Sequence, residues 1–270
     1  MVRVSESTAH VEADGASYAP AISADGQRIA YFSEATNLVP NDVNLMVDLT
    51  LLGRDVFVWD RTAGTTVLAS VDSSGQQDSG DSAWPAISGD GKVVSFQSDV
   101  TTLVANDTNA LSDVFLRTLA TGTTTLASAS DPRVATSADG DSTPVAGSAI
   151  SGDGNLIVFQ SLATNLLPGD QTFDGSNCTD IFLKNRETGQ LTLLSVNPQT
   201  GEQANADCNA PSISRNGRYV VFDSSASNLV PSEVTSPAAP TTLAVIANRN
   251  RAGPLASTDT SPRTRPLSPR

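Results

Sequence analysis

The 270-residue sequence has few of the residues on which most catalytic and zinc chemistry depends: one histidine, two cysteines and 5% aromatic residues. The single histidine, His10, would have to carry any Ser-His-Asp catalysis alone. Cys178 and Cys208 are too few and too far apart to indicate a zinc site. No run of 18 apolar residues exists, which argues against a membrane-spanning helix. Residues 1–8 lack the charged start and apolar stretch of a signal peptide, so the sequence as given predicts a soluble chain without an export signal.

Basic residues are also scarce, and they are unevenly distributed. The formal net charge is −13, which divides into −16 for residues 1–231 and +3 for residues 232–270. Phosphate binding needs a basic surface, so the acidic charge of residues 1–231 argues against a nucleic-acid partner. The five arginines of the last segment are able to contact an anion, but a short tail of this kind is more often only disordered, and we expect it to be disordered.

No long apolar stripe with a helical period is present, and we therefore predict an all-β chain. The stretch Pro85 to Phe96 places Asp-Gly between a short apolar run and a β-branched run, which is typical of a tight hairpin. Three further copies occur, at residues 20–32, 149–159 and 211–222. Their turn glycines recur about every 63 to 65 residues, and a period of this size indicates a repeat architecture.

Each complete unit is predicted to contain four short strands, which is the content of one β-propeller blade. We expect about three complete blades, with partial blades at the beginning and the end. The expected strands are residues 19–23, 28–33, 55–60 and 65–71 in the first unit, 86–88, 93–97, 113–117 and 123–127 in the second, and 149–151, 156–160, 180–184 and 191–196 in the third. After the second strand each unit carries a related loop sequence, whose leucines (Leu38, Leu103, Leu166 and Leu229) are expected to anchor the loop to the blade.

The repeat sequence ends near Pro231, where Pro, Ala, Thr and Arg become frequent. We therefore assign residues 1–231 to the repeat domain and residues 232–270 to a low-complexity tail. Residues 241–248 lie about where the third strand of unit four belongs and are a candidate to replace it. The abrupt change also suggests a truncated or frame-shifted reading of a longer parent.

The repeated Pro-Ala-Ile-Ser-x-Asp-Gly segment resembles the PD40 repeat, a WD40-like repeat of the TolB-type β-propellers. The resemblance covers residues 1 to about 231 and is carried by residues 23–26, 88–91 and 151–154, while Asn216 replaces the aspartate in unit four. It implies a bacterial, usually exported protein that binds through its blades, and therefore an extracytoplasmic location. Members normally have about six blades, more than this chain supplies.

The loops that follow the second strand of each unit are long and rich in oxygen-bearing side chains. In the third unit the spacing of Asp170, Thr172, Asp174 and Asp180 resembles the opening of an EF-hand loop, although Ile181 stands where the last carboxylate is expected. Oxygen ligands from one flexible loop suit calcium, so these loops are candidate calcium sites. The alternative is that the residues only make turns and cap strands. The equivalent candidates in the other units are Asp107, Asn109 and Asp113, and Asp42, Asn44 and Asp55.

The two cysteines fall at neighbouring positions of the expected topology. Cys178 precedes the third strand of unit three, and Cys208 precedes the first strand of unit four, so both lie on the same face. We predict a disulfide between them, which would enclose 29 residues and join two units; the alternative is two packed thiols. A disulfide would also indicate an oxidising compartment.

Together these features favour a non-catalytic binding or scaffold module with a protein partner, not an enzyme. Self-association through the open propeller edges is also expected. The alternative is a fragment of a carbohydrate-active or peptidase-linked enzyme, because carboxylate pairs are abundant, although no Gly-x-Ser-x-Gly motif is present. Trp59 and Trp84 are expected to be packing residues instead of sugar platforms.

Overall fold

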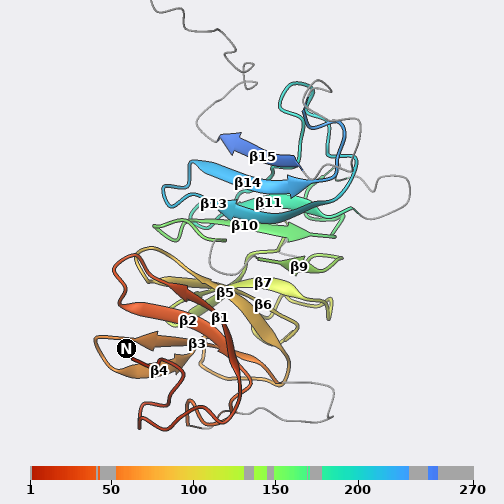
Figure 1. Cartoon of the computed structure of the whole chain (residues 1–270). Helices are drawn as coiled ribbons and strands as arrows, with labels where there is room; N and C mark the ends of the chain where they lie inside the picture. The colour runs from red at the N-terminus through yellow and green to blue at the C-terminus, as the bar shows by residue number, and fades with distance from the viewer. Residues whose placement is uncertain are drawn as a thin grey trace, which may run out of the picture.

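The computed structural model describes residues 2–40, 42, 53–130, 137–144, 149–168, 170, 178–230 and 243–248. These residues form three four-stranded antiparallel sheets and one three-stranded sheet, which follow one another as the blades of an incomplete β-propeller (Figure 1). This confirms the predicted all-β class and blade count. Among the described residues there is no helix long and apolar enough to cross a membrane.

Each blade takes its strands in chain order. Blade 1 contains β1 (Ser17–Ile22), β2 (Arg28–Ser33), β3 (Asp55–Asp60) and β4 (Thr65–Leu68); blade 2 contains β5 (Ser82–Ile87), β6 (Val93–Ser98), β7 (Asp113–Thr118) and β8 (Thr123–Leu126); blade 3 contains β9 (Ser142–Thr143), β10 (Leu156–Ser161), β11 (Asp180–Asn185) and β12 (Leu191–Leu193); and blade 4 contains β13 (Cys208–Ile213), β14 (Tyr219–Ser224) and β15 (Leu243–Asn248). Extensive contacts between elements of different blades join consecutive blades only.

The hairpin between the first two strands of each blade is stabilised by its turn residues. In blade 1 the Ser23 hydroxyl donates to Asp25 Oδ1 (2.6 Å), and the same oxygen accepts the Gln27 amide (3.0 Å). Gly26 has φ 68°, in the left-handed region that glycine occupies without steric cost. The Ser-x-Asp-Gly repeat is therefore a turn motif, as the sequence predicts.

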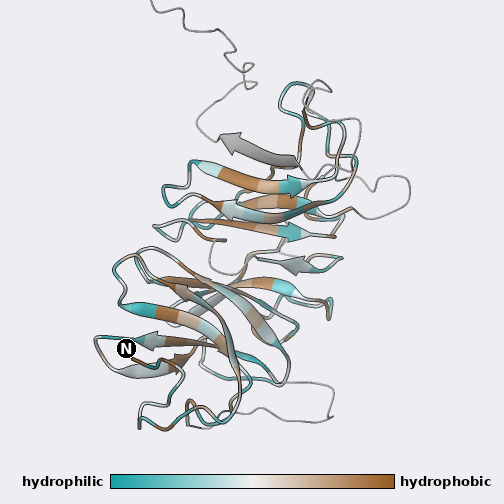
Figure 2. Ribbon diagram, in the orientation of Figure 1, coloured by the Kyte–Doolittle hydropathy of each residue, from teal (hydrophilic) through white to brown (hydrophobic). Residues whose placement is uncertain are grey.

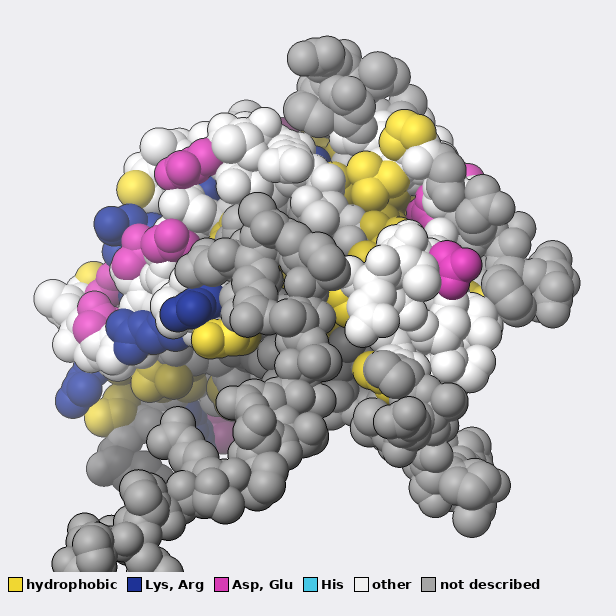
Figure 3. All heavy atoms as spheres, turned by 90° about the horizontal axis from the view of Figure 1, so that it is seen from above, with side chains coloured by type: hydrophobic (Ala, Val, Ile, Leu, Met, Phe, Trp, Pro, Cys, Tyr) yellow, Lys and Arg dark blue, Asp and Glu magenta, His cyan; other side chains and the backbone are white. Residues whose placement is uncertain are grey.

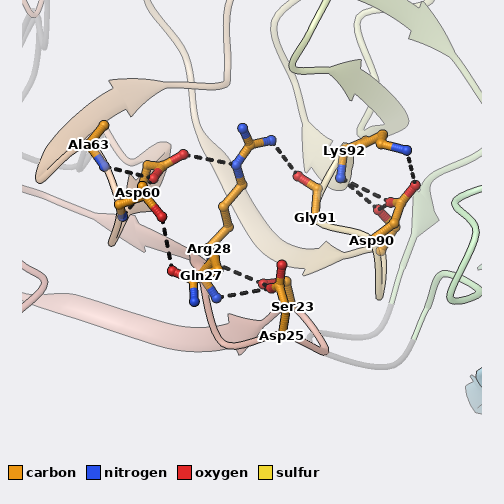
Figure 4. Close-up of polar contacts among 11 residues, drawn as sticks. Ser23, Asp25, Gln27, Arg28, Asp60, Ala63, Asp90, Gly91 and Lys92 are labelled. Carbon is orange, nitrogen blue, oxygen red and sulfur yellow. Dashed lines mark hydrogen bonds and ion pairs between the residues drawn. The ribbon is translucent and has the colours of Figure 1, made fainter.

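Neighbouring blades are joined through these turns. Ala24 donates its amide hydrogen to Gly89 O (2.9 Å). Arg28 donates to Asp60 Oδ2 of its own blade (3.1 Å) and to Gly91 O of blade 2 (2.8 Å; Figure 4). The hydrogen bond between Ala24 and Gly89 fixes the position of one blade relative to the next, because it joins backbone groups of both turns.

The hydrophobic core lies between the sheets, where apolar strand centres of one blade face those of the next (Figure 2). Within blades 2 and 3 the central two strands stack phenylalanines, with ring centroids 5.8 Å apart for Phe96 and Phe115 and 5.7 Å for Phe159 and Phe182. The predicted loop anchors are confirmed, since the four loop leucines are all buried.

The first strand of the blades departs from the prediction. In blades 1 and 2 it begins earlier than expected, and in blades 1, 2 and 4 it contains a bulge, seen as a register shift between Tyr18 and Ala21, between Ala83 and Ala86, and between Asn209 and Ser212. The residue before the proline at each bulge has positive φ: 46° for Ala19, 54° for Trp84 and 51° for Ala210. A bulge adds one residue to one strand, which a regular two-residue alternation does not predict.

Two further strands also differ from expectation. In blade 3 the strand expected at residues 149–151 is represented only by a bridge between Ile150 and Ile157, and the first strand is β9. In blade 4 the segment proposed to replace the third strand does form β15, which pairs with β14 from Tyr219–Asn248 to Ser224–Leu243.

Candidate functional site

A buried aspartate begins the third strand of blades 1, 2 and 3. These residues are Asp55, Asp113 and Asp180. Each accepts a hydrogen bond at Oδ1 from a serine 15 residues later, which follows the fourth strand; the pairs are Ser70 with Asp55, Ser128 with Asp113, and Ser195 with Asp180. Burial raises the pKa of Asp55 to about 7 and that of Asp113 and Asp180 to about 6, and the serine hydroxyls offset part of this effect.

A second aspartate from the preceding loop lies beside each of them. In blade 1, one glutamine amide bridges the two carboxyl groups: Gln77 Nε2 donates to Asp42 Oδ1 (2.9 Å) and to Asp55 Oδ2 (2.7 Å). In blade 3, Gln203 Nε2 donates in the same way to Asp170 Oδ1 (2.9 Å) and Asp180 Oδ2 (2.6 Å). Both glutamines come from the connector that leads into the next blade.

Blade 2 has the two aspartates but a different arrangement of donors. Asn109 Nδ2, from the loop itself, donates to Asp113 Oδ2 (2.8 Å) and to Ala138 O (2.6 Å). Asp107 is only 6% exposed, and neither of its carboxylate oxygens has a hydrogen-bond partner. Burial raises the pKa of Asp107, and the nearby backbone amide of Asn109 offsets part of this effect.

The structure thus brings together the predicted ligands Asp107, Asn109 and Asp113, and it also pairs Asp42 with Asp55 and Asp170 with Asp180. Asn44, Thr172 and Asp174 lie outside the described residues, so the resemblance to an EF-hand loop stays a prediction. Within the described part of the chain, no group of three or more His, Cys, Asp or Glu side chains is placed to hold a metal ion. Sequence reasoning missed the two bridging glutamines, which lie 22 and 23 residues after the aspartates Asp55 and Asp180.

Cys178 and Cys208 lie on adjoining segments, and no disulfide joins them in the structure. The Cys208 amide donates to Thr179 O (2.8 Å), next to Cys178 in the chain. The Cys208 thiol is buried 3.1 Å from Ser224 Oγ, and burial raises its pKa to about 12. The disulfide therefore stays a prediction, and forming it would require the Cys208 side chain to leave its serine partner.

The two tryptophans have opposite environments. Trp59 is 7% exposed and packs with Tyr31 and Phe57, as expected of a packing residue, whereas Trp84 is 45% exposed. Trp84 contacts Phe32 edge to face, with ring centroids 5.8 Å apart, and Phe32 in turn stacks on the half-exposed Tyr18 (5.2 Å).

A small cavity of about 140 Å³ lies beside Trp84. Its walls include Arg54 and Asp81, which form an ion pair, and also Gln97 and Asp99. Arg54 also lies over the Phe32 ring, 5.8 Å from its centroid. We call Tyr18, Phe32, Trp84 and Arg54 the aromatic surface. It combines exposed aromatic area with hydrogen-bonding groups.

His10, on which a catalytic triad would depend, lies in an exposed turn of the first connector. Its Nδ1 is 2.9 Å from Glu6 Oε1, in an i,i+4 pair. The imidazole is thus paired with a carboxylate and remains exposed to solvent.

No family model matches this sequence. No curated protein matches it either. Similar solved structures include a protein assigned as TolB from Agrobacterium tumefaciens (16% identity over 78% of this chain and 70% of that one, TM-score 0.42) and TolB from Acinetobacter baumannii (16% identity, 80% and 53%, TM-score 0.33). A prolyl endopeptidase is also similar, with 14% identity over 78% of this chain and 26% of that one, at a TM-score of 0.47. These alignments concern the fold alone, and this chain spans about half or less of the latter two proteins.

Proposed function

We propose that this chain is a non-catalytic binding or scaffold module that presents the aromatic surface to a protein partner and holds calcium in its loops. The observation that carries the proposal is the exposure of Trp84. The same bulge position is occupied by alanine in blades 1 and 4, at Ala19 and Ala210. Blade 2 therefore holds a large aromatic side chain at a left-handed backbone position where the fold accepts a small one.

The chemistry of the surface suits a protein partner. Tryptophan, tyrosine and arginine are the residues that most often dominate the energy of protein interfaces, and they act best around a desolvated pocket. The aromatic surface offers all three beside the small cavity, and Asp81 and Asp99 on the cavity wall favour a partner that brings a basic side chain.

The proposal extends to location. The PD40-like repeats resemble those of exported bacterial proteins, and on this basis we place the protein outside the cytoplasm. The competing hypothesis is a propeller fragment of a carbohydrate-active or peptidase-linked enzyme, in which the buried carboxyl groups would act on a substrate. In blades 1 and 3 these groups are occupied by glutamine amides, which supports a structural role instead.

Site-specific photo-crosslinking would test the proposal. A photoreactive amino acid at position 84 is expected to capture a defined protein in extracts of the source cells. The matched control places it at Val67, which is equally exposed on β4 in blade 1. Equal capture from both positions would contradict the proposal, as would turnover of a glycoside or peptide substrate that is lost in the Asp113→Asn variant.

A further inference from the structure

We propose that the cation site of this protein is the blade 2 loop, where Asp107 and Asp113 bind one divalent cation of the calcium type, and that glutamine side chains close the equivalent loops of blades 1 and 3. The inference rests on the proposed calcium-holding function and assigns it to one loop. It differs from the sequence prediction, which favours the loop of blade 3.

The difference between the loops originates in the following connector. Gln77, Ser137 and Gln203 each lie five residues before the first strand of the following blade, which begins at Ser82, Ser142 and Cys208. The loop asparagines agree with this equivalence, because Asn165 Nδ2 donates to Ser137 O (3.1 Å) as Asn228 Nδ2 donates to Gln203 O (2.8 Å). Ser137 thus stands where Gln77 and Gln203 stand, but its side chain has no amide, and its hydroxyl accepts the Thr108 amide instead (3.3 Å).

The missing amide leaves an electrostatic deficit in blade 2. In blade 1, Gln77 satisfies one oxygen of Asp42 and one of Asp55, and Asp42 Oδ2 is left without a partner. In blade 2 both oxygens of Asp107 lack partners although the residue is almost fully buried. A buried polar atom without a partner destabilises the fold, and a buried charge without a partner destabilises it more, so a counter-charge is expected at this point.

The chemistry of the loop suits a hard divalent cation. Asp107 and Asp113 are close enough for the charge of one to raise the pKa of the other, and together they offer two negative charges. The chain turns at Ala110, whose φ is 55°, so that the loop folds back between the two aspartates. Calcium accepts such mixed sets of carboxylate, amide, carbonyl and water oxygens in flexible loops. Asn109, whose amide now bonds to Asp113 Oδ2, would be the third ligand of the loop.

The test uses the full chain after treatment with a chelator, and it measures the melting temperature with and without millimolar calcium chloride. Calcium is expected to raise the melting temperature of the unmodified chain, because a ligand that binds the folded state stabilises it. Calorimetric titration should give one bound ion per chain. Asp107→Asn should abolish the increment, while the matched variants Asp42→Asn and Asp170→Asn should retain it.

A second variant guards against misfolding of Asp107→Asn. Ser137→Gln installs the missing amide and should raise the melting temperature in the absence of calcium while removing the response to it. The reciprocal change, Gln77→Ala, should create a second calcium response.

The possible failures are distinguishable. A calcium response that is lost in Asp170→Asn and kept in Asp107→Asn would overturn the assignment to blade 2 but preserve calcium-holding loops. No calcium response in the unmodified chain would overturn both, without affecting the photo-crosslinking result at Trp84. Stabilisation by mild acid alone, with no effect of calcium, would show that Asp107 holds a proton in place of the cation and would also overturn the inference.

Discussion

Blades 1 and 4, at the two ends of the arc, differ in what covers them. The outer face of blade 1 buries Tyr31, Phe57 and Trp59 beneath the N-terminal segment, where Val4 packs on this cluster and its carbonyl accepts the Tyr31 hydroxyl (3.1 Å). In blade 4, Tyr219 and Val221 on β14 are each 39% exposed. Figure 3 views the molecule from the blade 4 side and shows hydrophobic atoms between the polar ones.

The comparison with blade 3 shows what the blade 4 face lacks. Tyr219 and Val221 correspond to Leu156 and Val158 on β10, which are 7% and 0% exposed because blade 4 packs on them. An apolar residue at these positions is therefore stabilising only when another element covers the sheet. The same residue type contributes to the core in one blade and to an interaction surface in the next.

The largest effect is expected from the covered end. Trp59→Ala should lower the free energy of unfolding by about 3 to 5 kcal/mol, because it leaves a large cavity under the N-terminal segment. Trp84→Ala, the matched change at an exposed site, should cost under about 1 kcal/mol. Urea denaturation of both variants measures the difference, and similar losses would show that the two aromatic environments are wrongly distinguished.

The end blades also bury different ionisable groups. Asp55, which is buried in blade 1, makes the stability of the fold depend on pH. Its folded pKa of about 7 lies above the unfolded value of 3.8, so the folded state holds the proton more tightly. This contribution to stability is complete below about pH 4 and is lost as pH rises through 7, an effect of a few kcal/mol at most. Asp55→Asn should flatten that part of the stability profile. A profile unchanged by the substitution would contradict the assignment to Asp55.

A matched pair of substitutions compares blades 3 and 4 directly. Val158→Ala should cost about 2 kcal/mol, because it removes buried methyl groups between two blades. Val221→Ala, at the equivalent place on the open face, should cost less than about 0.5 kcal/mol. If both cost the same in urea denaturation, the blade 4 face is covered in solution.

The exposed face of blade 4 should also promote self-association, and this is the smallest of the effects that we expect. We expect the purified chain to associate as its concentration rises, and Val221→Lys should shift it toward the monomer by placing a charge on that face. Ile22→Lys changes an exposed apolar residue of blade 1 and serves as the control. Sedimentation velocity over a wide concentration range measures this association. If the unmodified chain stays monomeric throughout the range, association through blade 4 is contradicted.

Much of the fold could be predicted from the sequence because its determinants are local. Strands β2 and β3 have the bounds that their β-branched runs predict, and the turn at Gly26 follows from the Asp-Gly pair. The bulge before Pro85 was not predicted, since it depends on a left-handed residue that no local preference would place there. The aspartates of the candidate site were also found from their repeat positions, but their hydrogen-bond partners were not.

The sequence by itself determined the repeat, the hairpins and the positions of the loop aspartates, because each follows from the properties of adjacent residues. The tertiary structure decided which tryptophan is exposed and which aspartate is left without a partner. Gln77 reaches Asp42 across 35 residues, and Ser137 stands at the equivalent place beside the blade 2 loop. Such pairings depend on how one blade packs against the next, and no pattern within a single repeat encodes that distance.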